Sequence, residues 1–175
     1  VQKMLDTPGI REKTEDIYAT FLEPSAGDGN FLEAILERKL SAVTKNYHNK
    51  NWETKSLFAL SSIYGIEYLE DNLEVARVRM FLHYLNWAEK VFGERLSSRS
   101  DLYKSAHYLI TKNIVRGNTL TKRHPDTDEP IMFNEWKRIK GYPSLVEKVP
   151  FAFAELFGED IVDNGKMVEG QLSLF

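Results

Sequence analysis

The sequence FLEPSAGDGNFL, residues 21–32, joins an apolar run to a glycine-rich turn and then to an amphipathic segment. The apolar run, residues 19–24, ends in an acid and a proline, which is typical of a short buried strand. Small residues follow over 25–30. The segment FLEAILERKL, residues 31–40, gathers apolar side chains on one helical face, with Asn30 as N-cap. This order predicts a strand, a turn and a helix.

The same alternation continues along the chain. SSIYGIEYL (61–69) predicts a second strand, and apolar residues at helical spacing predict a helix over 71–92 that Gly93 caps. A further helix over 100–112 leads into NIVRGNTL (113–120), which predicts a third short strand and turn. Strands that alternate with helices predict an α/β fold with a mostly parallel sheet and helices on both faces.

The pattern is weaker elsewhere. Residues 41–55 and 121–130 are polar and predict loops. IMFNEWKRI (131–139) predicts another strand, and VEKVPFAFAELF (146–157) predicts a strand followed by a short helix.

Length and composition narrow the class of protein. At 175 residues the chain suits one domain, which we expect over 1–158, followed by a flexible tail over 159–175. No apolar run approaches the roughly 20 residues of a membrane helix. The chain has no cysteine and four scattered histidines, so we expect no metal site and a cytoplasmic protein. The formal charge of −3 argues against nucleic-acid binding by overall electrostatics, although local basic patches remain open.

The glycine turn is the first candidate for a binding site, because ligands of parallel α/β sheets bind at the carboxyl ends of the strands. Gly27 and Gly29 let the backbone approach a ligand, and the following helix offers free N–H groups. Glu67 would end the second strand, where a carboxylate accepts hydrogen bonds from both hydroxyls of a ribose. The glycines do not spell G-x-G-x-x-G, and Glu67 lies further on than the roughly 20 residues of that pattern, so a nicotinamide cofactor fits less well.

These stretches resemble the motifs of bacterial DNA adenine-N6 methyltransferases from restriction–modification systems, which use S-adenosylmethionine. FLEPSAGDGNFL resembles their motif I, IYGIEYLEDNLEVARVRM (63–80) their motif II, and NIVRGNTL their motif III. VQKMLD (1–6) resembles the end of an N-terminal helix that normally follows a Thr-Pro pair, which here would lie before Val1. The resemblance covers about the first 120 residues and implies a Rossmann-like methyltransferase fold.

The resemblance also implies roles for residues at three strand ends. Glu67 would bind the ribose of the cofactor, Tyr68 would lie against its adenine, and Asn118 would hydrogen-bond the amino edge of that ring. Alternatively, Phe31 and Tyr68 are core aromatics and Asn118 is a turn residue, whereas a buried acid that ends an apolar strand needs a partner. The residues implied to wrap the methionine part are Glu23, Pro24, Ser25, Ala26, Gly27, Asp28, Gly29, Asn30 and Phe31.

The catalytic motif of that family is missing. It reads (Asp/Asn/Ser)-Pro-Pro-(Tyr/Phe) after the fourth strand and holds the amino group and ring of a flipped base, but this sequence contains no Pro-Pro pair. By position, IMFNEW falls at the fourth strand, so Asn134, Glu135 and Trp136 are candidates for lining the equivalent pocket. A tryptophan at the end of an edge strand is more often a packing residue.

DNA is the partner that the resemblance implies, with a specificity or second catalytic subunit supplying what this short chain lacks. Local basic stretches offer a DNA path, although a solvated charged face explains them equally well. These residues are Lys112, Arg116, Lys122, Arg123, His124, Lys137, Arg138 and Lys140.

The last five residues, QLSLF, resemble the pentapeptide by which bacterial polymerases and repair proteins bind the replicative sliding clamp. The resemblance implies that Leu174 and Phe175 fill an apolar pocket, that Leu172 fills a neighbouring cleft and that Gln171 supplies hydrogen bonds. The alternative is a C-terminal strand that completes the core.

Three interpretations of function follow. The chain is a DNA adenine methyltransferase of restriction–modification or mobile-element type, a catalytically silent protein of that fold that binds the cofactor or the clamp, or a methyltransferase that acts on RNA or protein.

Overall fold

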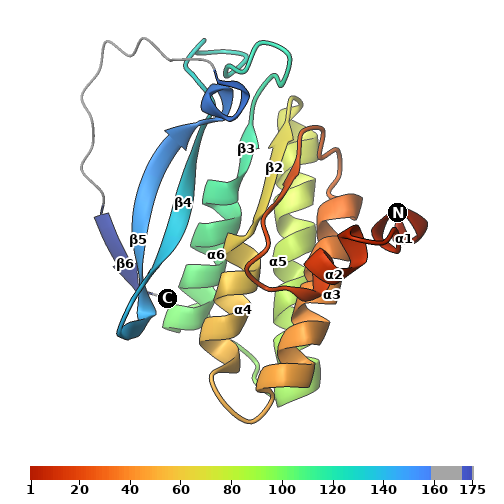
Figure 1. Ribbon diagram of the computed structural model, residues 1–175, viewed down its shortest axis with the longest axis vertical. Helices are drawn as coiled ribbons and strands as arrows, with labels where there is room; N and C mark the ends of the chain where they lie inside the picture. Colours follow the sequence, from red (N-terminus) through yellow and green to blue (C-terminus); the bar gives the residue numbers. More distant parts are fainter. Residues whose placement is uncertain (159–170, 175) are drawn as a thin grey trace.

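The computed structural model describes residues 1–158 and the backbone of residues 171–174 (Figure 1). Among these residues, no helix is long and apolar enough to cross a membrane. The elements in chain order are α1 (Gln2–Leu5), α2 (Ile10–Glu15), β1 (Phe21–Glu23), α3 (Asn30–Tyr47), α4 (Trp52–Ser61), β2 (Ile63–Glu67), α5 (Glu70–Phe92), α6 (Asp101–Asn113), β3 (Ile114–Arg116), β4 (Met132–Ile139), β5 (Tyr142–Ala152), the 3-10 helix η1 (Phe153–Phe157) and β6 (Gln171–Leu174).

The first three strands form a parallel sheet in the order β1-β2-β3. β2 is central, and all five of its residues are buried because it has a neighbour on each side. Glu23 of β1 pairs with Gly65, and Glu67 of β2 pairs with Arg116 of β3, so the three carboxyl ends share one edge of the sheet. The predicted α/β fold with a parallel sheet is confirmed for these strands.

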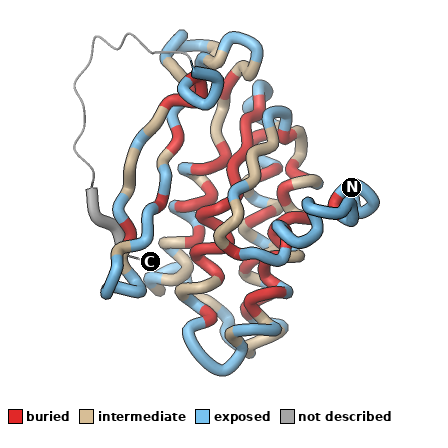
Figure 2. The backbone as a smooth tube through the Cα atoms, in the orientation of Figure 1, coloured by how far each residue is buried: buried red, intermediate tan, exposed pale blue. Residues whose placement is uncertain are grey.

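Helices α3, α4, α5 and α6 contact one another and pack against this sheet. Along α5, Ala76, Met80 and Tyr84 recur at intervals of four residues and are all buried. The Tyr84 hydroxyl lies 2.7 Å from the Ser56 hydroxyl of α4, which satisfies both buried groups. Gly93 caps α5 with φ 69°, as predicted. Figure 2 shows burial concentrated on the strands and on the helical turns that face them.

The prediction of a loop over 41–55 is wrong. α3 continues to Tyr47, and α4 begins at Trp52 after a short turn. The stretch is polar only on its outer side, since Trp52 is buried and stacks on Phe92 with ring centroids 4.1 Å apart. A single large aromatic side chain therefore supplies burial that a count of polar residues does not detect.

The predicted strand over 131–139 is present as β4, but β4 does not join the parallel sheet. It pairs antiparallel with β5, and β6 pairs with the other side of β5 in a separate sheet. Ile139 pairs with Tyr142 across a two-residue turn in which Gly141 adopts φ 86°. Tight hairpin turns need a residue in the left-handed region, so Gly141 directs the chain straight back on itself.

This hairpin packs on the face of the parallel sheet from which Tyr64 projects. The Tyr64 hydroxyl donates a hydrogen bond of 2.7 Å to the carbonyl of Asn134, and its ring meets the edge of Phe133 at 5.3 Å. Burial and the Glu135 carboxylate raise the pKa of the Tyr64 hydroxyl, so it stays a donor. Helices were expected on both faces of the sheet, but the hairpin covers this one.

The predicted flexible tail is described only in part. The backbone of Gln171–Leu174 pairs antiparallel with Leu145–Lys148 of β5. Residues 159–170 and Phe175 lie outside the described residues.

Candidate functional site

The glycine turn lies at the carboxyl edge of the parallel sheet and is bonded to the neighbouring strand. The N–H of Gly27 donates a hydrogen bond of 2.7 Å to Oε2 of Glu67, forty residues further along the chain. Gly29 adopts φ 87° and is the N-cap of α3, a position that the sequence assigned to Asn30. The turn and the strand-terminal acid are thus brought together, as the sequence predicted.

The two glycines of the turn serve different purposes. A Cβ on Gly29 would lie 2.8 Å from Cα of Ala76, so this glycine is needed where α3 approaches α5. A Cβ on Gly27 would meet nothing within 4 Å, although φ of 55° still favours glycine. Close packing therefore explains Gly29, while the backbone at Gly27 faces open space that a ligand can enter.

Glu67 is the buried acid of this edge, with 7% of its surface exposed. Oε1 accepts a hydrogen bond of 3.0 Å from the N–H of Leu69, and Oε2 accepts the one from Gly27. A carboxylate has about four acceptor positions, and these bonds occupy about two of them. Glu67 is thus anchored by a backbone N–H group on each oxygen.

Arg79 of α5 fixes the turn and was not identified from the sequence. Its Nε donates 2.9 Å to the carbonyl of Asp28, and Nη2 lies 3.2 Å from the Asp28 carboxylate. Nη1 donates 2.9 Å to the side-chain oxygen of Asn30. The helical spacing of α5 could have indicated this role. Arg79 follows Ala76 by three residues, so the two side chains share the face of α5 that meets Gly29.

The loop after β3 reaches the same edge. The Thr119 hydroxyl donates to the carbonyl of Pro24, which joins this loop to the glycine turn. The side-chain oxygen of Asn118 accepts from the N–H groups of Leu120 and Thr121, so in this state it acts as a turn residue. Its predicted contact with an adenine ring remains a prediction.

The remaining predicted cofactor residues differ in how far their side chains are exposed. The N–H of Ser25 donates 3.0 Å to Oε1 of Glu23, which stabilises the start of the turn. Phe31 is partly buried and packs against the core, whereas Tyr68 is 52% exposed beside Glu67. Tyr68 is therefore free to lie along a bound ring.

The three catalytic candidates do not meet the glycine turn. The indole N–H of Trp136 donates 2.9 Å to Asn113, which itself donates to the carbonyls of Ser61 and Ile63 at the amino end of β2. Glu67 ends the same strand about 13 Å away, at roughly 3.3 Å per residue. The edge with Trp136 is opposite to the edge with the turn.

The neighbours of Trp136 are engaged as well. The carbonyl of Asn134 accepts from Tyr64, and the Glu135 carboxylate lies 3.6 Å from Nζ of Lys137. Trp136 is therefore a packing residue, Asn134 contributes its backbone carbonyl, and Glu135 is exposed.

Several basic residues near the carboxyl edge already have acidic partners. Arg116 is paired with Asp126, and Arg123 lies 3.9 Å from the carboxylate of Asp128. Within residues 1–158, no group of three or more histidine, aspartate or glutamate side chains is placed to hold a metal ion.

Comparison of the chain with protein-family models, curated proteins and solved structures finds no match.

Proposed function

We propose that this chain binds S-adenosylmethionine at the carboxyl edge of β1, β2 and β3 and serves the methylation of adenine in DNA. The observation that carries the proposal is the bond between the Glu67 carboxylate and the N–H of Gly27. It joins a ribose-binding acid and an open glycine turn in one unit. The free acceptor positions of Glu67 suit the two hydroxyls of a ribose, and the exposed Tyr68 suits a stacked adenine.

A second candidate function is cofactor binding without methyl transfer by this chain alone. The placement of Trp136 favours it, since its indole is packed at the edge opposite to the turn. In that case a partner subunit would supply the catalytic group. The C-terminal peptide, residues 171–175, is proposed to bind the sliding clamp under either candidate.

Calorimetric titration with S-adenosylmethionine tests the binding step. Glu67→Gln keeps an acceptor for Gly27 but removes the charge, and hydrogen bonds to charged groups contribute about 1.5–3 kcal/mol, so we expect a loss of affinity of about 10-fold to 150-fold. Glu89→Gln, an exposed acid on α5, is the matched control and should bind like the wild type. Equal affinities for wild type and Glu67→Gln would contradict the proposal.

Transfer of a tritiated methyl group separates the candidate functions. The purified chain is incubated with adenine-containing DNA, adenine-free DNA, RNA and protein, each with labelled cofactor. Transfer only to adenine-containing DNA supports the first candidate, and binding without transfer supports the second. Transfer only to RNA or protein would contradict both.

A further inference from the structure

A second candidate site lies at the amino edge of the parallel sheet, on the side away from the glycine turn. A cavity of about 740 Å³ opens there between α4 and the β4–β5 hairpin. Its lining contains four cationic side chains, Lys55, Lys137, Arg138 and Lys140, and one acid, Glu135. The cavity lining therefore has a positive charge, whereas the whole chain has a formal charge of −3.

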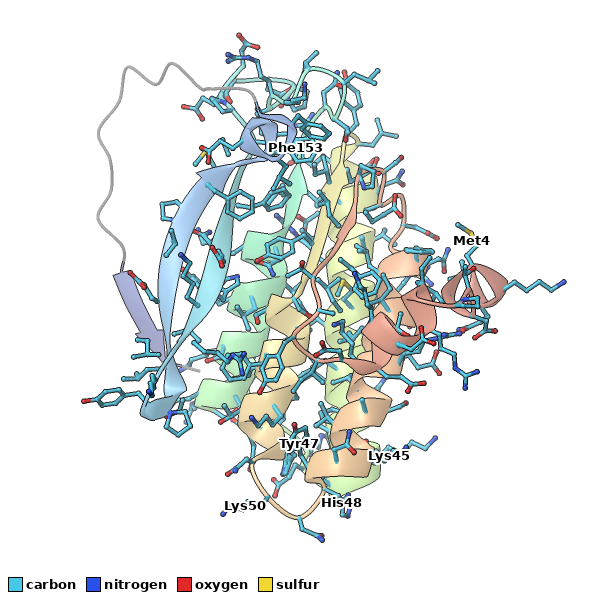
Figure 3. The ribbon with its side chains drawn as sticks, viewed as in Figure 1. Met4, Lys45, Tyr47, His48, Lys50 and Phe153 are labelled. Carbon is cyan, nitrogen blue, oxygen red and sulfur yellow. The ribbon has the colours of Figure 1, made fainter. Side chains whose placement is uncertain are left out.

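Two cations of this cavity, Arg138 and Lys55, are held against aromatic rings. The guanidinium carbon of Arg138 lies 4.0 Å from the centre of the Tyr18 ring. Nζ of Lys55 donates 2.8 Å to the Tyr18 hydroxyl and lies 5.1 Å from the ring centre of Tyr47, which is labelled at the foot of the molecule in Figure 3. Such contacts orient a cation without neutralising it.

Arg138 and Lys140 remain available to an anion. Within the described residues, neither is paired with a carboxylate, and both are exposed. One face of the Arg138 guanidinium rests on Tyr18, so the exposed side chain offers its other face to a planar group. Tyr142, at the end of the hairpin, adds an aromatic ring that is 59% exposed.

We propose that this cavity binds single-stranded nucleic acid. Exposed lysine and arginine side chains attract the phosphates, while the Arg138 guanidinium and the Tyr142 ring stack on unpaired bases. A duplex hides its bases and would leave those two surfaces unused, so single strands should bind more tightly. The site is separate from the cofactor edge and does not depend on the function proposed there.

Fluorescence anisotropy with labelled decathymidylate tests the proposal on the full chain. Stacking on one side chain contributes about 1–3 kcal/mol, so Arg138→Gln and Tyr142→Ala should each weaken binding by about 5-fold to 150-fold. Arg138→Lys keeps the charge but lacks the planar group, so we expect an intermediate loss. Lys3→Gln removes an exposed cation on α1 and should change nothing.

Salt dependence and competitors identify the ligand class. Each phosphate contact contributes a slope of about −0.7 in the logarithm of affinity against the logarithm of salt, so Lys140→Gln, which removes an exposed cation of the cavity, should reduce the magnitude of the slope by about that amount. The same sequence as a duplex should compete weakly, and polyglutamate should not compete. No binding by the wild type, unchanged affinity in both Arg138→Gln and Tyr142→Ala, or equal competition by polyglutamate would overturn the proposal.

Discussion

At the scale of single residues, Arg79 makes the side-chain contacts that hold the glycine turn of the candidate cofactor edge in its conformation. It contacts a carbonyl, a carboxylate and an amide oxygen within three residues of the glycine turn. Within the turn, the Asn30 side chain donates 2.6 Å to the Asp28 carboxylate, and Arg79 holds both residues from outside. The turn therefore depends on α5, fifty residues further along the chain.

We expect Arg79→Met to loosen the turn while retaining most of the packing of the side-chain stem. Losing hydrogen bonds to charged and polar partners should lower the free energy of unfolding by about 1–3 kcal/mol and weaken S-adenosylmethionine binding by about 10-fold. Urea denaturation and calorimetry measure the two effects. Arg95→Met, at an exposed position after α5, is the control, and a loss of equal size there would refute the role of Arg79.

Lys39 is a second residue with a specific consequence, because it is fully buried. Nζ donates 2.6 Å to the carbonyl of Asp16 and 2.7 Å to the carbonyl of Ala19, which ties α3 to the segment before β1. Burial lowers the pKa of the Lys39 ammonium to about 7, although the Asp16 carboxylate opposes the shift. The unfolded chain then binds one more proton than the folded chain between about pH 7 and pH 10.

Stability should therefore rise with pH across that window, by up to about 1.4 kcal/mol per pH unit from this residue. Lys39→Met removes the contribution, so its free energy of unfolding should change less between pH 7 and pH 10 than that of the wild type. Urea denaturation at several pH values measures this. The control is Lys45→Met, an exposed position on the same helix. Parallel curves for wild type and Lys39→Met would exclude this origin of the pH dependence.

At the scale of elements, the sequence predicts the three parallel strands and the long helices because their apolar residues recur at regular periods. Over residues 41–55 no regular spacing of apolar residues predicts a helix. The first residue of α4, Trp52, is nevertheless buried. The spacing of apolar residues also cannot show which sheet β4 joins. The two-residue turn at Gly141 explains only why β4 pairs with β5, whereas the packing of this hairpin on the parallel sheet depends on tertiary contacts such as that of Tyr64 with Asn134.

The C-terminal peptide both forms strand β6 and is proposed to bind the sliding clamp. Its backbone pairs with β5 over Gln171–Leu174, so binding a clamp through the same residues would compete with this pairing. We expect an immobilised bacterial sliding clamp to retain the wild-type chain but not the Leu174→Ala/Phe175→Ala double variant, because apolar anchors provide most of such binding. Leu120→Ala, which shortens a leucine that is 92% exposed, is the control. Equal recovery of the wild type and the double variant would show that the peptide is only a strand.

At the scale of the whole molecule, the parallel sheet separates two chemically different ends. Glu67 and the glycine turn lie at the carboxyl edge, and the aromatic and cationic cavity with Arg138 lies at the amino edge. The sequence predicts the first end because strand order alone brings Gly27 and Glu67 together. The second end combines Tyr18, Lys55 and the hairpin, which are far apart in the sequence, so only the tertiary structure reveals it.

The most direct test of the central claim is a two-dimensional ¹⁵N–¹H NMR titration of the chain with S-adenosylmethionine. We predict that the largest shifts will fall on the amides of Gly27 and Leu69, which bond to Glu67, and on the amide of Gly29 in the same turn. The amides of Arg138 and Tyr142 should stay in place, and Glu67→Gln should need a higher concentration for the same shifts. Shifts confined to the hairpin, or no shifts at saturating cofactor, would contradict the assignment of the carboxyl edge as the cofactor site.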